Sequence, residues 1–217
     1  METGFPHVVR CCLIFFSLLF LTGCGGSPSK GLLEKYQTTE QTPAAFGVCK
    51  GYGCTRYLRI NMTAEEWQSV LAAFDPAPED AAAERRALAV AVSRIEQIVG
   101  PKTNTENDAP GAQIVNLNTS GQMDCIDEAF NTTTYLNMLS RAGMLRWHRV
   151  GHPLRRGYVF DGWPHNTATI HEKNSDNDIE GPGHYVVDSW FHGNGIAPEI
   201  VPASQWAEGW SPQTVRP

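Results

Sequence analysis

The stretch MDCIDEAFNTTTYLNMLSRAG, residues 123–143, decides the fold. We expect a helix from Asp124 to Gly143, because glycine is favoured just beyond a helix end. One face of this helix carries residues at helical spacing, namely Ile126, Ala129, Thr133, Leu136 and Leu139. The first turn holds the thiol of Cys125, where unpaired backbone N–H groups favour a thiolate over a thiol.

Two more helices are expected before this one. Thr63-Ala-Glu-Glu66 is a capping-box pattern that opens a helix to about residue 74. A second helix over 79–99 buries one stripe and ends at Gly100-Pro101. The stripe consists of Leu88, Val92, Ile95 and Val99.

After Gly143 the apolar pattern changes to a period of two. This predicts strands at 145–151, 157–161, 166–171 and 184–191, separated by turn residues. The proline-rich stretch 193–217 is expected to wrap irregularly, with Trp206 and Trp210 as anchors. Helices over 61–143 followed by antiparallel strands over 144–192 predict an α+β fold, with the N-terminal helices packed on the sheet. Residues 55–60 alternate weakly and predict a further strand.

The N-terminus carries a targeting pattern. An apolar run at 13–21 behind Arg10 has the length of a signal-peptide core and is too short to span a bilayer. It ends in Leu21-Thr-Gly-Cys24, which resembles a bacterial lipobox. The resemblance implies a signal peptide at 1–23, a lipid on Cys24 that attaches the chain to the membrane, and a lipidated polar tether over 24–48. Gly25 is typical of outer-membrane lipoproteins that face the periplasm.

Composition excludes two classes of protein. Of 217 residues, 41% are hydrophobic and only 18% are charged, which argues against general disorder. The net charge is −6, with no basic run, so nucleic acid is not an expected partner.

Three cysteines remain after Cys24. Cys49 and Cys54 flank a short glycine-containing loop, which favours a disulfide in an oxidising compartment; half of a zinc site is the alternative. Cys125 is then an odd thiol in an exported protein. It is either a reactive group or an inert buried residue.

Two residues downstream favour the reactive interpretation. His165 starts a predicted strand, and Asp188 interrupts the next apolar strand, where a carboxylate is costly without a partner. If these strands pair, Asp188 can orient the imidazole of His165 toward the thiol.

The ordered set Asp124-Cys125-Ile-Asp127-Glu-Ala129, His165 and Val187-Asp188-Ser-Trp190 resembles the transglutaminase-like cysteine peptidases of bacteria, over about 113–192. The resemblance implies a papain-like, transglutaminase-like domain over 49–217, without a cofactor or resident metal. It implies Cys125 as nucleophile, His165 as general base and Asp188 as orienting residue. The expected activity is hydrolysis of amide or peptide bonds, in a peptide or protein substrate of the cell envelope.

Several alternatives stay open. His171, His184 or His148 is an alternative base. The oxyanion donors are the Cys125 N–H with Gln122, or with an earlier amide such as Gln113 or Asn116. The same triad also serves a transamidase. A non-catalytic envelope module for binding or assembly is a further alternative.

Metal sites are possible at three places. Asn174, Asp176, Asp178 and Glu180 alternate like half of a calcium loop, although a solvated hairpin tip gives the same pattern. Some transglutaminase-like enzymes use calcium, for which Asp124, Asp127 and Glu128 are the carboxylates of interest. His184, Asp188 and His192 have an even spacing that can point them to one side of a strand.

Overall fold

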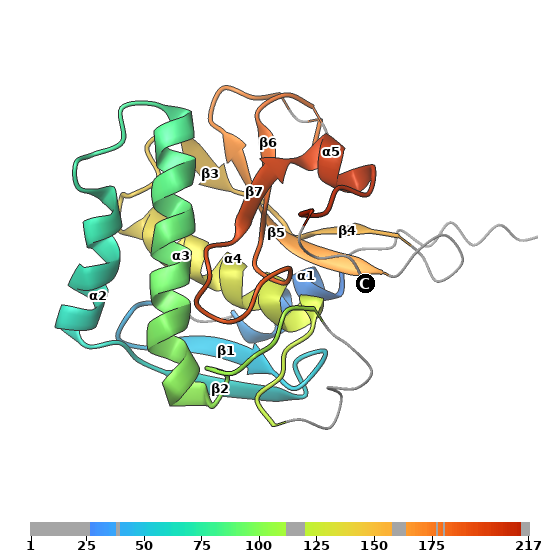
Figure 1. Cartoon of the computed structure of the whole chain (residues 1–217). Coiled ribbons are helices and arrows are strands. Elements are labelled where there is room, and N and C mark those ends of the chain that lie inside the picture. Colours follow the sequence, from blue (N-terminus) through green and yellow to red (C-terminus); the bar gives the residue numbers. More distant parts are fainter. Residues whose placement is uncertain are drawn as a thin grey trace, which may run out of the picture.

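Helix α4 (Cys125–Arg141) lies at the centre of the computed structural model, which describes residues 27–37, 40–111, 120–157, 164–176, 178–179 and 181–213. It packs against strand β5 (His165–Glu172) on one side and strand β1 (Phe46–Lys50) on the other (Figure 1). Because it is enclosed on both sides, most of its side chains are buried. The helix predicted from Asp124 is confirmed, with Asp124 as its N-cap.

The main sheet is antiparallel and has the order β3-β5-β6-β7, with β4 also pairing with β5. Its other strands are β3 (His148–Val150), β4 (Leu154–Arg156), β6 (His184–Asp188) and β7 (Glu199–Pro202). β3 and β4 pair with opposite ends of the long strand β5. The predicted strands at 145–151, 166–171 and 184–191 are therefore present with shifted ends, and helices with antiparallel sheets agree with the α+β class.

Two predictions about the second half of the chain are wrong. The strand expected at 157–161 lies earlier, as β4, and residues 158–163 are outside the described part. The stretch from 193 is not wholly irregular, since it forms β7 and the short helix α5 (Ala203–Ala207). Prolines misled the prediction: Pro198 precedes β7 and Pro202 is its last residue, and a strand at a sheet edge tolerates proline.

The helices before α4 cover the sheet. α2 (Ala64–Leu71) starts with the predicted capping box of Thr63 and Glu66 and continues into the 3-10 turn η1 (Ala72–Phe74). α3 (Ala81–Thr103) buries the predicted stripe of leucine, valine and isoleucine almost completely. It does not stop at Gly100-Pro101 as predicted. Pro101 lies in its last turn, and the helix ends where Asn104 takes a left-handed conformation with φ 56°.

The segment expected as a tether is partly folded. α1 (Pro28–Tyr36) packs against α4, and β1 forms an antiparallel hairpin with β2 (Arg56–Ile60). Tyr36 stacks on Tyr57, with ring centroids 4.2 Å apart. These apolar contacts bind the N-terminal part to the core, so the folded domain begins well before residue 49.

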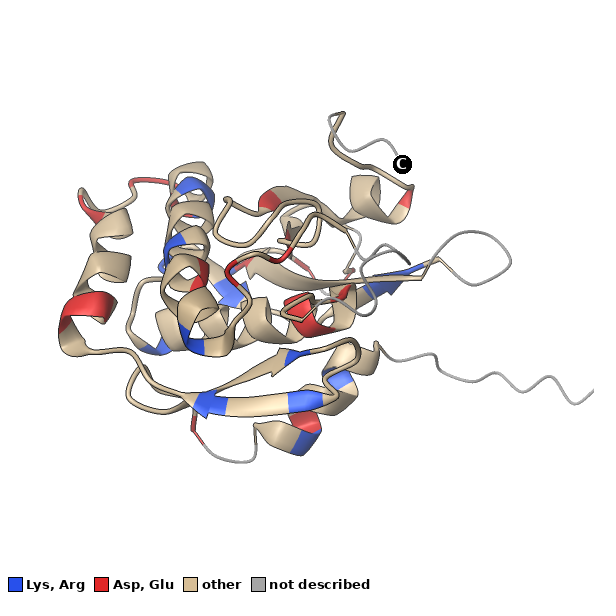
Figure 2. Cartoon of the chain, turned by 60° about the horizontal axis from the view of Figure 1, so that its bottom comes forward, with Lys and Arg blue, Asp and Glu red and all other residues tan. Residues whose placement is uncertain are grey.

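Charge is distributed over several elements. Figure 2 shows basic residues on both strands of the β1–β2 hairpin, namely Lys50, Arg56 and Arg59, and acidic residues at the start of α2. Within the described ranges, no helix has both the length and the apolar character needed to span a bilayer. Cys24 and the predicted signal peptide lie outside those ranges.

Candidate active site

Cys125 is fixed at the first position of α4 by the capping chemistry around it. The Asp124 carboxylate accepts hydrogen bonds from the N–H groups of Ile126 and Asp127, and the Asp127 carboxylate accepts one from the Asp124 N–H. The thiol is 8% exposed. It therefore has a defined position at the positive end of the helix, where a negative charge on sulfur is favoured.

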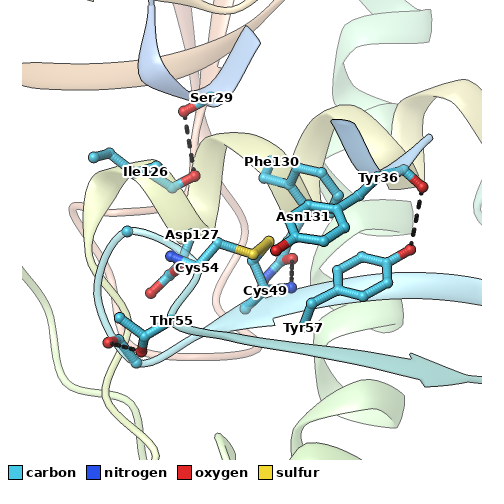
Figure 3. The surroundings of a disulfide bond; sticks show 12 residues. Ser29, Tyr36, Cys49, Cys54, Thr55, Tyr57, Ile126, Asp127, Phe130 and Asn131 are labelled. Atoms are coloured by element: carbon cyan, nitrogen blue, oxygen red, sulfur yellow. Dashed lines mark hydrogen bonds between the residues drawn. A yellow bond between two sulfur atoms is a disulfide. The ribbon is translucent and has the colours of Figure 1, made fainter. Parts of the chain in front are cut away.

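The capping carboxylates also secure the loop between β1 and β2. Asp127 accepts hydrogen bonds from the N–H groups of Tyr52 and Cys54, and Cys54 is joined to Cys49 by a disulfide (Figure 3). The Asn131 side chain completes the contact by bonding both backbone groups of Cys49. The sulfurs that a zinc site would need are thus covalently paired with each other, and the disulfide loop packs on the turn that carries the thiol.

His165 and Asp188 come from the neighbouring strands β5 and β6. Nε2 of His165 lies 2.7 Å from Oδ2 of Asp188, and both side chains are buried. The same carboxylate oxygen accepts a hydrogen bond of 2.8 Å from the indole N–H of Trp206. The rings of Trp190, Phe191 and Trp206 surround the imidazole. This apolar enclosure makes the ion pair strong, because little water screens it.

The electrostatics of His165 couple it to both neighbours. Burial lowers its pKa, but the Asp188 carboxylate, its hydrogen bond to the ring and the nearby Cys125 thiol outweigh burial and raise that pKa to about 9. Nδ1 is buried and has no hydrogen-bond partner among the described residues. With Nε2 held by Asp188, Nδ1 is the nitrogen that can take the thiol proton. The structure therefore brings the three predicted site residues together.

The other candidate bases lie elsewhere. The Nδ1 atoms of His171 and His184 are 2.6 Å apart, and both residues line a separate cavity of about 490 Å³. Burial and the neighbouring His184 lower the pKa of His171 to about 4. His148 is buried against Glu84, with a distance of 2.8 Å. In the described residues none of these three histidines has a hydrogen bond to Cys125, so His165 is the base that the geometry favours.

The candidate metal ligands are engaged in other contacts. His184 pairs with His171, Asp188 with His165, and the third member, His192, lies 2.8 Å from Glu199. These contacts divide the set instead of converging it on one point.

The calcium-like pattern is likewise not assembled. Asp176 accepts a hydrogen bond from the Asp178 N–H, as in a turn, and Glu180 is outside the described residues. Asp124 and Asp127 are occupied by backbone N–H groups, as described above.

Gln122 is not placed as the predicted oxyanion donor. Its Oε1 accepts a hydrogen bond from the Ala109 N–H, and its Nε2 donates to the Asn107 carbonyl. Both ends of the amide thus hold the 105–111 loop. The alternatives Gln113 and Asn116 lie outside the described residues.

Two residues near the thiol were missed by the sequence analysis. Nδ2 of Asn166 donates to Sγ of Cys125 over 3.6 Å, and the thiol itself points to the Pro164 carbonyl at 3.8 Å. Trp206, expected only as an anchor, bonds Asp188. A usable signal for Asn166 was present: a polar amide inside a buried strand needs hydrogen-bond partners.

Three carboxyl groups without a basic partner lie behind the first turn of α4. Burial raises the pKa of Glu96 and of Asp108 to about 7, and it raises the pKa of Glu128 well above the ordinary value. Asp108 and Glu128 are hydrogen-bonded to each other, and Glu96 accepts a bond from the Gly195 N–H. Such groups stay neutral in the interior more readily than in water.

Comparison of the chain with protein-family models, with curated proteins and with solved structures finds no match.

Proposed function

We propose that this protein is a thiol-dependent hydrolase of amide or peptide bonds that acts through Cys125, His165 and Asp188. One observation carries the proposal: a thiol at a helix N-terminus faces an imidazole whose other nitrogen is held, 2.7 Å away, by a buried carboxylate. Nucleophile, base and orienting group in this arrangement are the components of a catalytic triad. We further propose a transglutaminase-like, papain-like architecture, which the motif order in the sequence supports.

The geometry supports a two-step mechanism. Nδ1 of His165 takes the thiol proton, and the sulfur attacks the carbonyl carbon, whose π electrons move to oxygen. When the tetrahedral intermediate collapses, the C–N bond breaks and Nδ1 gives its proton to the leaving amine. The imidazole then takes a proton from water, which attacks the thioester and releases the acid. Asp188 keeps the ring oriented throughout, and Trp206 keeps the carboxylate in place.

We also propose that the enzyme is a lipoprotein of the outer membrane that faces the periplasm. The lipobox-like sequence before Cys24 supports this location. The disulfide between Cys49 and Cys54 is compatible with an oxidising compartment. A peptide or protein of the cell envelope is the proposed substrate, because it is within reach of an anchored enzyme.

Two other functions use the same fold. An amine in place of water as the acceptor would make the enzyme a transamidase, with identical roles for the triad. A binding or assembly module would need no activated thiol. The ordered contacts of His165 with Asp188, and of Asp188 with Trp206, favour catalysis over simple packing.

The test is the rate at which iodoacetamide alkylates Cys125 as pH is varied, read by mass spectrometry of the full chain in detergent. We expect a thiol pKa well below the ordinary value of about 8.5. His165→Ala should remove this activation, whereas the control His184→Ala should keep it. A slow reaction with an ordinary thiol pKa in the wild-type chain would reject the hydrolase and favour the binding module.

A further inference from the structure

We propose that Asn166 supplies the side-chain donor of the oxyanion hole and that the backbone N–H of Cys125 supplies the second donor. This inference rests on the proposed function, because it assigns groups to the tetrahedral intermediate of the same thiol. It replaces Gln122, whose amide is used to hold the 105–111 loop.

The position of Asn166 fits this role. Its Nδ2 lies 3.6 Å from Sγ of Cys125, and the residue is only 2% exposed. The carbon that the sulfur attacks is bonded directly to that sulfur, and the oxyanion is attached to this carbon. A donor beside the sulfur is therefore close to the place where negative charge develops. In a buried site such a donor stabilises that charge more than water would.

The orientation of the amide is fixed by a second contact. The Ser27 hydroxyl donates a hydrogen bond of 2.8 Å to Oδ1 of Asn166, which leaves the NH₂ group on the side of the thiol. Ser27 is itself buried, and Ser29 ties the same helix start to α4 by donating to the Ile126 carbonyl. Ser27 is thus a positioning residue that holds the donor without touching the reacting atoms.

The backbone at the start of α4 offers the second donor. Asp124 accepts the N–H groups of Ile126 and Asp127 through its carboxylate, and its carbonyl accepts the N–H of Glu128. By contrast, the Cys125 N–H has no acceptor within the described residues. A donor from the strand and a donor from the helix thus lie on the two sides of the sulfur.

The experiment compares two reactions of the same thiol in the full chain. p-Nitrophenyl acetate acylates sulfur through a tetrahedral oxyanion, whereas iodoacetamide alkylates it without one. Release of p-nitrophenolate measures the first reaction, mass spectrometry at Cys125 measures the second, and the Cys125→Ala chain gives the background. We expect Asn166→Ala to slow acylation by roughly 10²- to 10³-fold and alkylation by less than about 10-fold.

Further variants guard against trivial explanations. Asn166→Asp keeps the shape of the side chain but lacks the NH₂ donor, so it should also slow acylation selectively. Ser27→Ala should slow acylation less, and Ser27→Thr should restore the rate because it keeps the hydroxyl. Thr169→Ala is the matched control, since Thr169 is a buried polar residue of the same strand that bonds the His152 carbonyl. It should leave the ratio of the two rates unchanged.

The outcomes separate the inference from the proposed function. Normal acylation in folded Asn166→Ala and Asn166→Asp chains would overturn the role of Asn166 and leave the hydrolase intact. Equal slowing of both reactions would also overturn it, because Asn166 would then act on the thiolate alone. A wild-type chain with an ordinary thiol pKa and no acylation at Cys125 would reject the hydrolase, and the oxyanion hole with it.

Discussion

Replacing Asp188 by Asn removes the negative charge beside His165 and keeps the shape of the side chain. Folding raises the pKa of His165 from 6.5 to about 9. At about 1.36 kcal/mol per pH unit, this difference corresponds to about 3 kcal/mol of folding free energy. Because the pKa is raised in the folded state, this stabilisation is fully present below pH 6.5 and is lost as the pH rises to about 9.

The Asp188→Asn chain should lack this stabilisation. Burial then becomes the main influence on His165 and lowers its pKa, so the ring is neutral when folded. The difference in free energy of unfolding between the wild-type and Asp188→Asn chains should be largest at pH 6 and shrink toward pH 9. Urea unfolding at pH 6, 7.5 and 9 measures it, and NMR of the His165 ring gives the pKa directly.

The matched control for this experiment is Asp176→Asn. Asp176 also lies near a histidine, with 3.9 Å between its Oδ1 and Nε2 of His184, but its side chain is 68% exposed. Its removal should change the stability little at any pH, because water screens the pair. The reasoning would be refuted by a wild-type His165 that titrates at or below 6.5, or by a difference for Asp188→Asn that stays constant with pH.

Three further changes have definite expected results. Trp206→Phe removes the indole donor to Asp188 and should lower the free energy of unfolding by about 1.5–3 kcal/mol in urea; an unchanged midpoint would contradict this. Glu96→Gln should flatten the loss of stability between pH 4.5 and 7 in a pH series, because the wild-type carboxyl holds its proton more tightly when folded; an equally steep loss would disprove it. Asp127→Ala leaves two N–H groups of the 51–54 loop without their acceptor and should cost at least about 2 kcal/mol, with faster proteolysis of that loop; a loop that resists protease as in wild type would count against it.

Local chemistry explains what was predicted well. The start of α4 at Cys125 follows from the Asp124 cap and the apolar periodicity, which act within a few residues. The pairing of Cys49 with Cys54 follows from their short separation. The end of α3 was missed, because Pro101 alone does not end a helix that can continue for part of a turn to a left-handed Asn104.

The sequence alone determined the α+β class, the thiol at a helix start, and a histidine and an aspartate at the right places on two neighbouring strands. Only the tertiary structure decided which groups complete the site. Trp206 comes from the C-terminal stretch and Ser27 from the helix start at the other end, and they reach Asp188 and Asn166 through packing. Such contacts join residues far apart in the chain, so neither periodicity nor motif spacing specifies them. They are set by the way that β6, α5 and α1 bury their apolar faces around α4.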